Sequence, residues 1–404
     1  MARRTGRERA LTRDDAPRLG LYLHVPFCAA LCRYCNFTRG LSDPALERRY
    51  VAALAREIRS GLAATGAGRG DRPAADTIYF GGGTPSLLAP PGIASLIRAC
   101  RESFDVDPSA EITLEANPET VTGDRLAGYL QAGVNRLSLG VQSLLDVELA
   151  RLGRVHDAAR ARQAYDDARR AGFDNIGLDL MLWLPGQSPA DLRVSVDEAA
   201  ALRPEHLSVY LLEVYPHLPL AAEMARHGWT RASDDEAADM YLETMARLEA
   251  AGYEQYEISN LARPGRRSRH NLKYWTGGAW AGFGCAAHST AGDERWENVP
   301  SVSEYLTRVE AGQAPVSARR RRSEQDRLEE ALFMGLRLTE GVAIDAIRAR
   351  YGVDVRERWG TRLAEFEEAG WIEPDPDRLR LTRRGMLVSS DVMITFLGPG
   401  STIQ

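Results

Sequence analysis

Three cysteines that lie within eight consecutive positions are the residues of this sequence best suited to chemistry. Cys28, Cys32 and Cys35 form a C-x3-C-x2-C pattern in the segment HVPFCAALCRYCNF. Three thiolates on one short loop can each bind a different iron of a cubane, which leaves the fourth iron without a protein ligand. The spacing therefore predicts a [4Fe-4S] cluster with one open iron. Structural zinc with His24 as a fourth ligand is the alternative, although such sites usually hold their ligands in two separated pairs.

Further polar and glycine residues occur in or just after short apolar runs. The segment YFGGGTPS contains three consecutive glycines, which let a backbone turn sharply and approach a ligand. No Lys-Ser/Thr pair follows them, so a Walker phosphate loop is excluded. Glu115, Gln142 and Asp179 stand in or at the end of later runs, where parallel α/β folds place functional groups. An unpaired buried carboxylate is costly, so the two acids need a ligand such as a ribose, or a neighbouring backbone group or arginine.

These residues lie on a repeated unit of a β-rich apolar run, a turn and a longer segment with helical periodicity. The alternation predicts an α/β fold with a parallel sheet covered by helices, either doubly wound or curled toward a barrel. After about residue 215 the alternation stops and helical stretches follow. The six predicted strands cover residues 21–25, 77–81, 111–116, 136–141, 176–182 and 206–212.

The same pattern divides the chain into four regions. We expect a flexible tail over residues 1–17, the α/β unit over 18–220 and a helical and connecting region over 221–320 that includes the segment HNLKYW. Residues 321–404 are predicted to form a mainly helical, winged-helix-like region, with a short strand pair around WIEPDPDRLRLT. Such modules often bind DNA, but the acidic helices favour a packing role. The run Arg319–Arg322 is interpreted as a solvated linker.

Composition limits the classes of partner and compartment. The 404 residues carry a net charge of -5, which argues against an extended nucleic-acid interface. Only five cysteines occur, and Cys100 and Cys285 are isolated, so a disulfide framework is not expected. Clustered thiols in a cysteine-poor chain indicate metal binding in a reducing compartment, and we expect a cytoplasmic protein. No run of 18 apolar residues is present.

The cysteine loop resembles the signature of the radical S-adenosylmethionine (SAM) enzymes. Its combination with GGGTPS, LEANPE, LSLGVQS, LGRVH and LMLWLPGQ is similar to the coproporphyrinogen dehydrogenase branch over most of residues 20–215. This resemblance implies a partial (β/α)6 TIM-type barrel that holds a [4Fe-4S] cluster and SAM. It also implies that Tyr34 lies against the adenine and that the glycine loop meets the methionine amino group. The SAM-binding residues that it implies are Tyr22, Tyr34, Gly82, Gly83, Thr84, Glu115, Gln142, Arg154 and Asp179.

Two features resemble one group within that branch, the heme chaperones. The oxygen-independent coproporphyrinogen oxidases carry a further cysteine two residues after the third cluster ligand, and this sequence has Phe37 there. The segment HNLKYW matches the HNxxYW motif of the chaperone group. The resemblance implies a protein that binds heme and delivers it to respiratory hemoproteins, with transient membrane contact; a homodimer is left open. The heme-binding residues that it implies are His270, Asn271, Tyr274 and Trp275.

The chemistry of the HNLKYW segment suits heme. An imidazole can ligate iron, and aromatic faces can cover the macrocycle. Basic residues can pair with propionates, and four arginines precede the motif. A lone histidine beside a tryptophan is more often a packing residue, so the heme assignment depends on the resemblance. His288 is a second candidate ligand, and Cys285 near it is interpreted as a small buried residue. The four arginines are Arg263, Arg266, Arg267 and Arg269.

A catalytic function is the rival hypothesis. In an oxygen-independent coproporphyrinogen III oxidase, the cluster would donate an electron to the sulfonium of SAM. The resulting 5'-deoxyadenosyl radical would abstract hydrogen from a porphyrinogen propionate, leading to decarboxylation. Such donation needs a potential near the low end of the cluster range, which extends to about -700 mV. Phe37 puts this activity in doubt, so whether the chain is an enzyme stays open.

Overall fold

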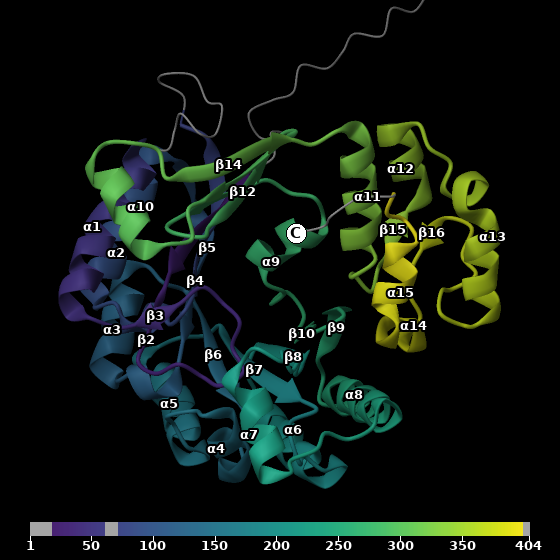
Figure 1. The fold of residues 1–404 in the computed structure, drawn as a ribbon, viewed down its shortest axis with the longest axis horizontal. Coiled ribbons are helices and arrows are strands. Elements are labelled where there is room, and N and C mark those ends of the chain that lie inside the picture. Colours follow the sequence, from purple (N-terminus) through teal and green to yellow (C-terminus); the bar gives the residue numbers. More distant parts are fainter. Residues whose placement is uncertain (1–17, 61–71, 399–404) are drawn as a thin grey trace, which may run out of the picture.

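A computed structural model of the chain describes residues 18–60 and 72–398, so the expected tail over residues 1–17 lies outside the described residues (Figure 1). Six parallel strands follow one another in chain order across a curved sheet, as in a TIM-type barrel. The α/β prediction and its six strands are therefore confirmed. The strands are β1 (Leu19–Val25), β4 (Ala74–Gly82), β5 (Asp105–Ala116), β6 (Arg136–Gln142), β7 (Ile176–Leu182) and β8 (His206–Leu211).

Alternation along β1 shows which face of the sheet becomes the interior of the barrel. Leu21 and Leu23 are fully buried in the main hydrophobic core. Tyr22 points to the other face, where it pairs in register with Tyr79 of β4, and the two rings stack 6.2 Å apart. Because successive strand residues alternate between faces, aromatic and polar side chains gather inside the barrel while aliphatic ones pack outward.

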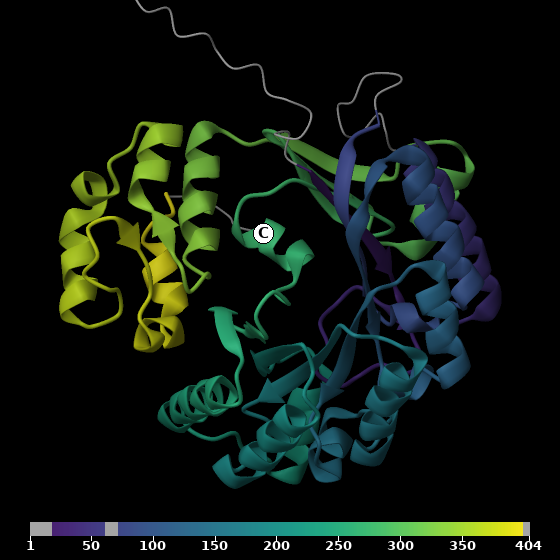
Figure 2. The ribbon, with the colours of Figure 1, turned by 180° about the vertical axis from the view of Figure 1, so that it is seen from behind.

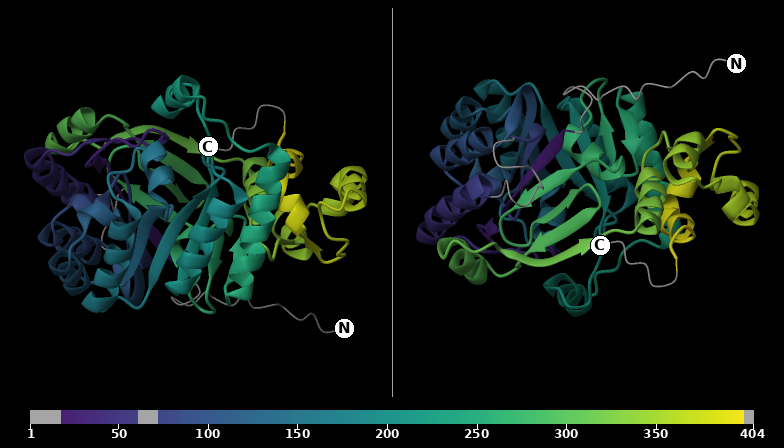
Figure 3. Two further views of the ribbon diagram at one scale, coloured as in Figure 1. Left: turned by 90° about the horizontal axis from the view of Figure 1, so that it is seen from below. Right: turned by 90° about the horizontal axis from the view of Figure 1, so that it is seen from above.

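Helices pack on the outer face of the curved sheet, as Figure 3 shows from two sides. Their termini follow ordinary capping rules. Asp157 accepts a hydrogen bond from Arg160 N at the start of α5, and Gly172 ends that helix at φ 105°. These helices are α1 (Pro44–Ser60), α2 (Pro90–Ser103), α3 (Gly123–Ala132), α4 (Asp146–Leu152), α5 (Ala158–Ala171), α6 (Pro189–Ala201), α7 (Pro219–His227) and α8 (Asp234–Ala250).

The region between residues 221 and 320 differs from the helical and connecting region that we expected. Besides α8, α9 (Arg269–Trp275) and α10 (Val302–Glu310), it contributes six strands that extend the sheet at both ends to twelve strands within the described residues. The run Arg319–Arg322 is not a linker, because it belongs largely to β14. The added strands are β9 (Glu254–Glu257), β10 (Asn260–Ala262), β11 (Trp280–Phe283), β12 (His288–Ala291), β13 (Glu294–Asn298) and β14 (Val316–Arg321).

Helix α9, which carries the HNLKYW segment, bridges the two flanks of the open barrel. It follows β10, which pairs with β8, and precedes β11, which pairs in parallel with β1. Figure 1 shows α9 between these two flanks. The carboxylate of Glu111 on β5 accepts hydrogen bonds from the backbone N–H groups of Arg269 and His270, each at 3.0 Å. A carboxylate at a helix N-terminus satisfies free N–H groups and complements the helix dipole.

The C-terminal region forms a separate core beside the barrel, as Figure 2 shows. Its β15 and β16 pair antiparallel, and an isolated bridge joins Ile372 to Leu381 across the segment predicted as a wing. Among the described residues, none of the helices has both the length and the apolar character needed to span a membrane. The elements are α11 (Glu324–Gly335), β15 (Val342–Ala343), α12 (Ile344–Tyr351), α13 (Val355–Glu368), β16 (Arg378–Leu379), α14 (Arg383–Leu387) and α15 (Ser389–Ile394).

Candidate cluster and cofactor site

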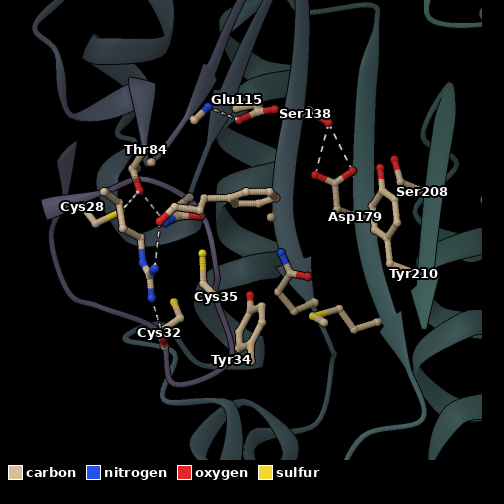
Figure 4. A pocket seen from close by; sticks show the side chains of 18 of the residues that line it. Cys28, Cys32, Tyr34, Cys35, Thr84, Glu115, Ser138, Asp179, Ser208 and Tyr210 are labelled. Carbon is tan, nitrogen blue, oxygen red and sulfur yellow. Dashed lines mark hydrogen bonds between the residues drawn. The ribbon is translucent and has the colours of Figure 1, made fainter. Parts of the chain in front are cut away.

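A cavity of about 410 Å³ lies at the carboxyl ends of the barrel strands (Figure 4). We call it the cluster cavity, because all three cysteines of the C-x3-C-x2-C loop line it. Eight of the nine residues predicted for SAM line it as well, and the ninth, Tyr22, lines an adjoining cavity. The eight are Tyr34, Gly82, Gly83, Thr84, Glu115, Gln142, Arg154 and Asp179.

The cysteine loop begins and ends on a two-stranded parallel ladder. β2 (Phe27–Cys28) pairs with β3 (Gly40–Leu41), and Ser42 N donates to the carbonyl of Cys28 at 2.9 Å. Arg39 donates to the carbonyl of Cys32 at 3.0 Å, which fixes the middle of the loop. Cys28 is buried, whereas Cys32 and Cys35 are partly exposed. Burial raises the pKa of the Cys28 and Cys35 thiols.

The thiols suit a cubane better than a single ion. Within residues 18–60 and 72–398, no group of three or more His, Cys, Asp or Glu side chains is arranged to hold one metal ion. Ligands of a cubane need not converge on one point, since each binds a different iron. The zinc alternative also lacks its fourth ligand, because both ring nitrogens of His24 are engaged, with Tyr22 Oη and with the carbonyl of Thr38, each at 3.1 Å.

A chain of hydrogen bonds connects two of the cysteines across the cavity wall. Thr84 Oγ1 donates to Cys28 Sγ at 3.6 Å and accepts from Asn117 Nδ2 at 3.1 Å. Arg154 then donates to Asn117 Oδ1 at 2.8 Å and to Cys32 Sγ at 3.4 Å. The guanidinium of Arg154 therefore supports both the second cysteine and the amide that bonds Thr84. The sequence did not single out Asn117, although it stands in the LEANPE segment after a predicted strand.

The glycine loop owes its composition to close packing against the cysteine loop. Gly82 has φ 116°, a conformation that favours glycine. A Cβ on Gly83 would lie 2.6 Å from the carbonyl oxygen of Phe27, so no larger residue fits there. The next residue, Thr84, donates its backbone N–H to the same oxygen at 2.7 Å. The close packing of the glycine loop therefore places Thr84 beside Cys28, the first cysteine of the pattern.

Two carboxylates line the cavity, Glu115 near the end of β5 and Asp179 in the middle of β7, with β6 between the two strands. Glu115 accepts from Tyr79 Oη at 2.8 Å and from Gly82 N at 3.1 Å. Burial raises the pKa of Glu115 to about 7. Ser138 Oγ lies 3.2 Å from both carboxylate oxygens of Asp179, and burial raises the pKa of Asp179 as well. Figure 4 shows both acids at a distance from the three cysteines, where ligand hydroxyl or ammonium groups would complete their bonding.

Other lining residues were not found from the sequence. Gln142 was predicted as a site residue, but the sequence did not show that its backbone is left-handed, with φ 68°. Such backbone strain often marks a functional position. Arg136 is 1% exposed and lines the cavity, and its Nε and Nη1 atoms have no hydrogen-bond partner among the described residues. Tyr79, Ser138 and Ser208 also line the cavity. A period-2 count of inward-facing strand positions would have identified all three.

The HNLKYW residues do not converge on one site. His270 is 1% exposed, with Nδ1 2.8 Å from Thr77 Oγ1 and Nε2 2.9 Å from Tyr274 Oη. Burial lowers the pKa of His270 to about 3, so the ring is neutral. Asn271 lines the cluster cavity, Tyr274 lines the adjoining one, and Trp275 lines a third cavity of about 550 Å³ beside the C-terminal core. In this structure His270 has no nitrogen free for iron.

The four arginines before the motif have partners within the protein. Arg267 pairs with Glu340 at 2.8 Å, and Arg269 pairs with Asp76 at 3.6 Å. Similarly, Arg266 pairs with Asp174 at 3.4 Å, and Arg263 donates to the carbonyl of Pro204 at 3.2 Å. The structure therefore does not support the hypothesis that these arginines pair with heme propionates. Cys285 is buried and lies 3.6 Å from Tyr50 Oη, in keeping with its reading as a small core residue.

Comparison with known proteins agrees with this geometry. Residues 22–199 match the Radical SAM superfamily, and residues 323–388 match the HemN C-terminal domain. The fold is similar to that of coproporphyrinogen III oxidase (HemN) from Escherichia coli, with a TM-score of 0.81 and 24% identity. That similarity covers 94% of this chain and 90% of the other. At this identity it shows the fold alone.

Curated relatives define the family more closely. The protein named heme chaperone HemW from Bacillus subtilis is 35% identical over 93% of this chain and 98% of its own length. A protein of the same name from Mycobacterium tuberculosis is 38% identical over 94% of this chain and 95% of its own. The Escherichia coli protein of that name is 39% identical over 67% and 70%. This chain therefore belongs to the radical SAM superfamily and, within it, to the family of proteins named HemW.

Proposed function

We propose that this chain is a heme chaperone, which binds heme and delivers it to respiratory hemoproteins. The main support is the name heme chaperone, which relatives carry at 35% and 38% identity over almost the whole chain. The site supplies a second argument. Phe37 takes the position of the additional oxidase cysteine, and this residue is 70% exposed and lines the cluster cavity. An exposed aromatic ring there suits contact with a flat apolar ligand.

The cluster cavity has the donors that a [4Fe-4S] cluster and SAM require. Cys28, Cys32 and Cys35 would hold the cluster, which together with SAM supplies one-electron chemistry at low potential. Arg154 offsets the negative charge of the cysteine loop, since it donates to Cys32 Sγ at 3.4 Å. Glu115 would accept hydrogen bonds from hydroxyl or ammonium groups of SAM. In the proposed chaperone these groups prepare or control heme transfer.

The rival function is oxygen-independent coproporphyrinogen III oxidase activity. Its support is the fold shared with HemN and the cavity with three cysteines. Two observations favour the chaperone over it: the names of the more similar relatives and Phe37 in place of a cysteine. We further propose that the protein acts in the cytoplasm, as a monomer or homodimer, with transient contact to the membrane that holds the recipients.

Two measurements on one anaerobic, reconstituted sample distinguish the functions. Iron and sulfide analysis first establishes that the cluster is loaded. We expect stoichiometric heme binding in a Soret titration and transfer of that heme to an apo-form of a membrane cytochrome. We expect no conversion of coproporphyrinogen III to protoporphyrinogen IX in the presence of SAM and a reductant. Efficient conversion without heme binding would refute the chaperone function.

A further inference from the structure

The cavity that adjoins the cluster cavity is walled by aromatic rings, and we call it the aromatic cavity. It has a volume of about 760 Å³, within the usual range of small-molecule sites. Tyr274 and Trp280 pack edge to face at 4.8 Å and form one wall together with Tyr22. Asn36, Phe37, Gly82 and Glu115 line both cavities. The aromatic cavity therefore opens directly beside the proposed SAM site.

A histidine with an available ring nitrogen lies in this cavity. His288 is the first residue of β12, and its side chain is 50% exposed. Its Nδ1 lies 3.5 Å from Oε2 of Glu297, which faces it on β13. Within the part of the chain that the structure describes, His288 Nε2 has no hydrogen-bond partner. Histidines that bind metals commonly donate the other ring nitrogen to a carboxylate, which fixes the ring and the tautomer.

The other histidine of the cavity and the histidine of the HNLKYW segment do not have this freedom. His24 is hydrogen-bonded through both nitrogens, and so is His270. His270 instead holds Tyr274 Oη at 2.9 Å, and Tyr274 packs against Trp280. Trp280 Nε1 in turn donates to the carbonyl of His288 at 3.1 Å. His270 is thus connected to the position of His288 through an aromatic pair.

We propose that heme binds in the aromatic cavity with its iron ligated by Nε2 of His288, and that His270 is a positioning residue for the cavity wall. This inference rests on the proposed function, because it names the site of the heme that the chaperone carries. Tyr274 and Trp280 cover the macrocycle, and the exposed ring of Phe37 lies at the border with the cluster cavity. Exposure of His288 leaves the iron accessible to a ligand from the recipient, as transfer requires.

Titration of ferric heme into the full-length, cluster-loaded protein tests this assignment, with optical and electron paramagnetic resonance spectra as readouts. We expect His288→Ala to lose the histidine-ligated spectrum and to weaken heme binding about tenfold, equal to about 1.4 kcal/mol. Added imidazole should restore that spectrum in His288→Ala. His270→Ala should keep histidine ligation but bind heme more weakly, because Tyr274 loses its anchor. His227→Ala is the matched control, an exposed histidine on α7 outside the cavity, and should resemble wild type.

The possible results distinguish the assignment of His288 as the iron ligand from the proposed heme chaperone function. A wild-type spectrum in His288→Ala, or loss of histidine ligation in His270→Ala alone, would overturn the assignment of His288 and leave the chaperone function standing. Wild-type protein that binds no heme would overturn the proposed function itself. Because the His288 side chain is half exposed at the start of β12, its replacement is not expected to unfold the chain, and circular dichroism of each variant checks this.

Discussion

Replacing Glu57 by glutamine should make the stability of the protein less dependent on pH. Glu57 is 7% exposed on α1 and accepts hydrogen bonds from Tyr305 Oη at 2.6 Å, Gly284 N at 2.8 Å and Asn298 Nδ2 at 2.6 Å. These bonds tie α1 to α10, to the end of β13 and to the residue that follows β11. Burial raises the pKa of Glu57 from 4.5 to about 7.

The sign and size of the effect follow from this shift. Between pH 4.5 and about 7 the folded state binds the Glu57 proton more tightly than the unfolded state. The free energy of unfolding therefore falls as pH rises through this window. One pKa unit corresponds to about 1.36 kcal/mol, so the loss between pH 5 and pH 8 is about 2 to 3 kcal/mol. A glutamine at position 57 stays neutral, so the variant does not lose this free energy of unfolding as the pH rises.

Urea denaturation at pH 5 and pH 8 measures the effect. The free energy of unfolding of Glu57→Gln, relative to wild type, should increase by about 2 to 3 kcal/mol from the lower to the higher pH. Glu102→Gln, at an exposed carboxylate on α2, controls for the loss of a surface charge. Equal pH dependence in Glu57→Gln and wild type would show that Glu57 is not held as a buried neutral acid.

Two further substitutions test the cofactor site and the helix that bridges the barrel. Arg154→Lys should weaken SAM binding to the cluster-loaded protein about tenfold in equilibrium dialysis, because the single nitrogen of lysine cannot reach the separate positions from which the two Nη atoms bond a thiol, an amide and a carbonyl. Arg170→Lys on the surface of α5 should bind SAM normally, and equal affinity in both variants would contradict the role of the guanidinium. Glu111→Ala should lower the free energy of unfolding by about 2 kcal/mol in urea, since one buried and one part-buried N–H group of α9 lose their acceptor. Glu102→Ala should cost little, and an equal loss there would refute the capping role.

The sequence predicted the features that depend on local pattern. Continuous apolar runs identified all six barrel strands, and polar residues in or at the end of these runs, such as Glu115 and Asp179, do line one cavity. The cysteine spacing likewise predicted a shared loop. These predictions succeeded because strand periodicity and strand ends are properties of short segments.

Features that depend on distant pairing could not be predicted in the same way. β13 and β14 have the sequences ERWEN and VSARRR, whose charges hide their strand character. β11 pairs with β1, although some 260 residues separate them. One hydrogen bond of His270 is made with Thr77, which lies far away in the chain. No local motif therefore shows that both ring nitrogens of His270 are hydrogen-bonded. A resemblance identifies such a motif without revealing what each of its side chains contacts.

Within the described residues the barrel strands form an open sheet, and α9 lies between the two flanks of the opening. A fully closed ring of strands can widen only by breaking backbone ladder bonds, each flanked by others that resist the change. Here side chains of β4 and β5 hold α9 in place: Glu111 binds the start of α9, Thr77 binds His270, and Asp76 pairs with Lys273 at 2.7 Å. Because no ladder of the described residues joins the outermost strands β9 and β14, a change of width at α9 would break side-chain contacts and leave every strand paired with its neighbours.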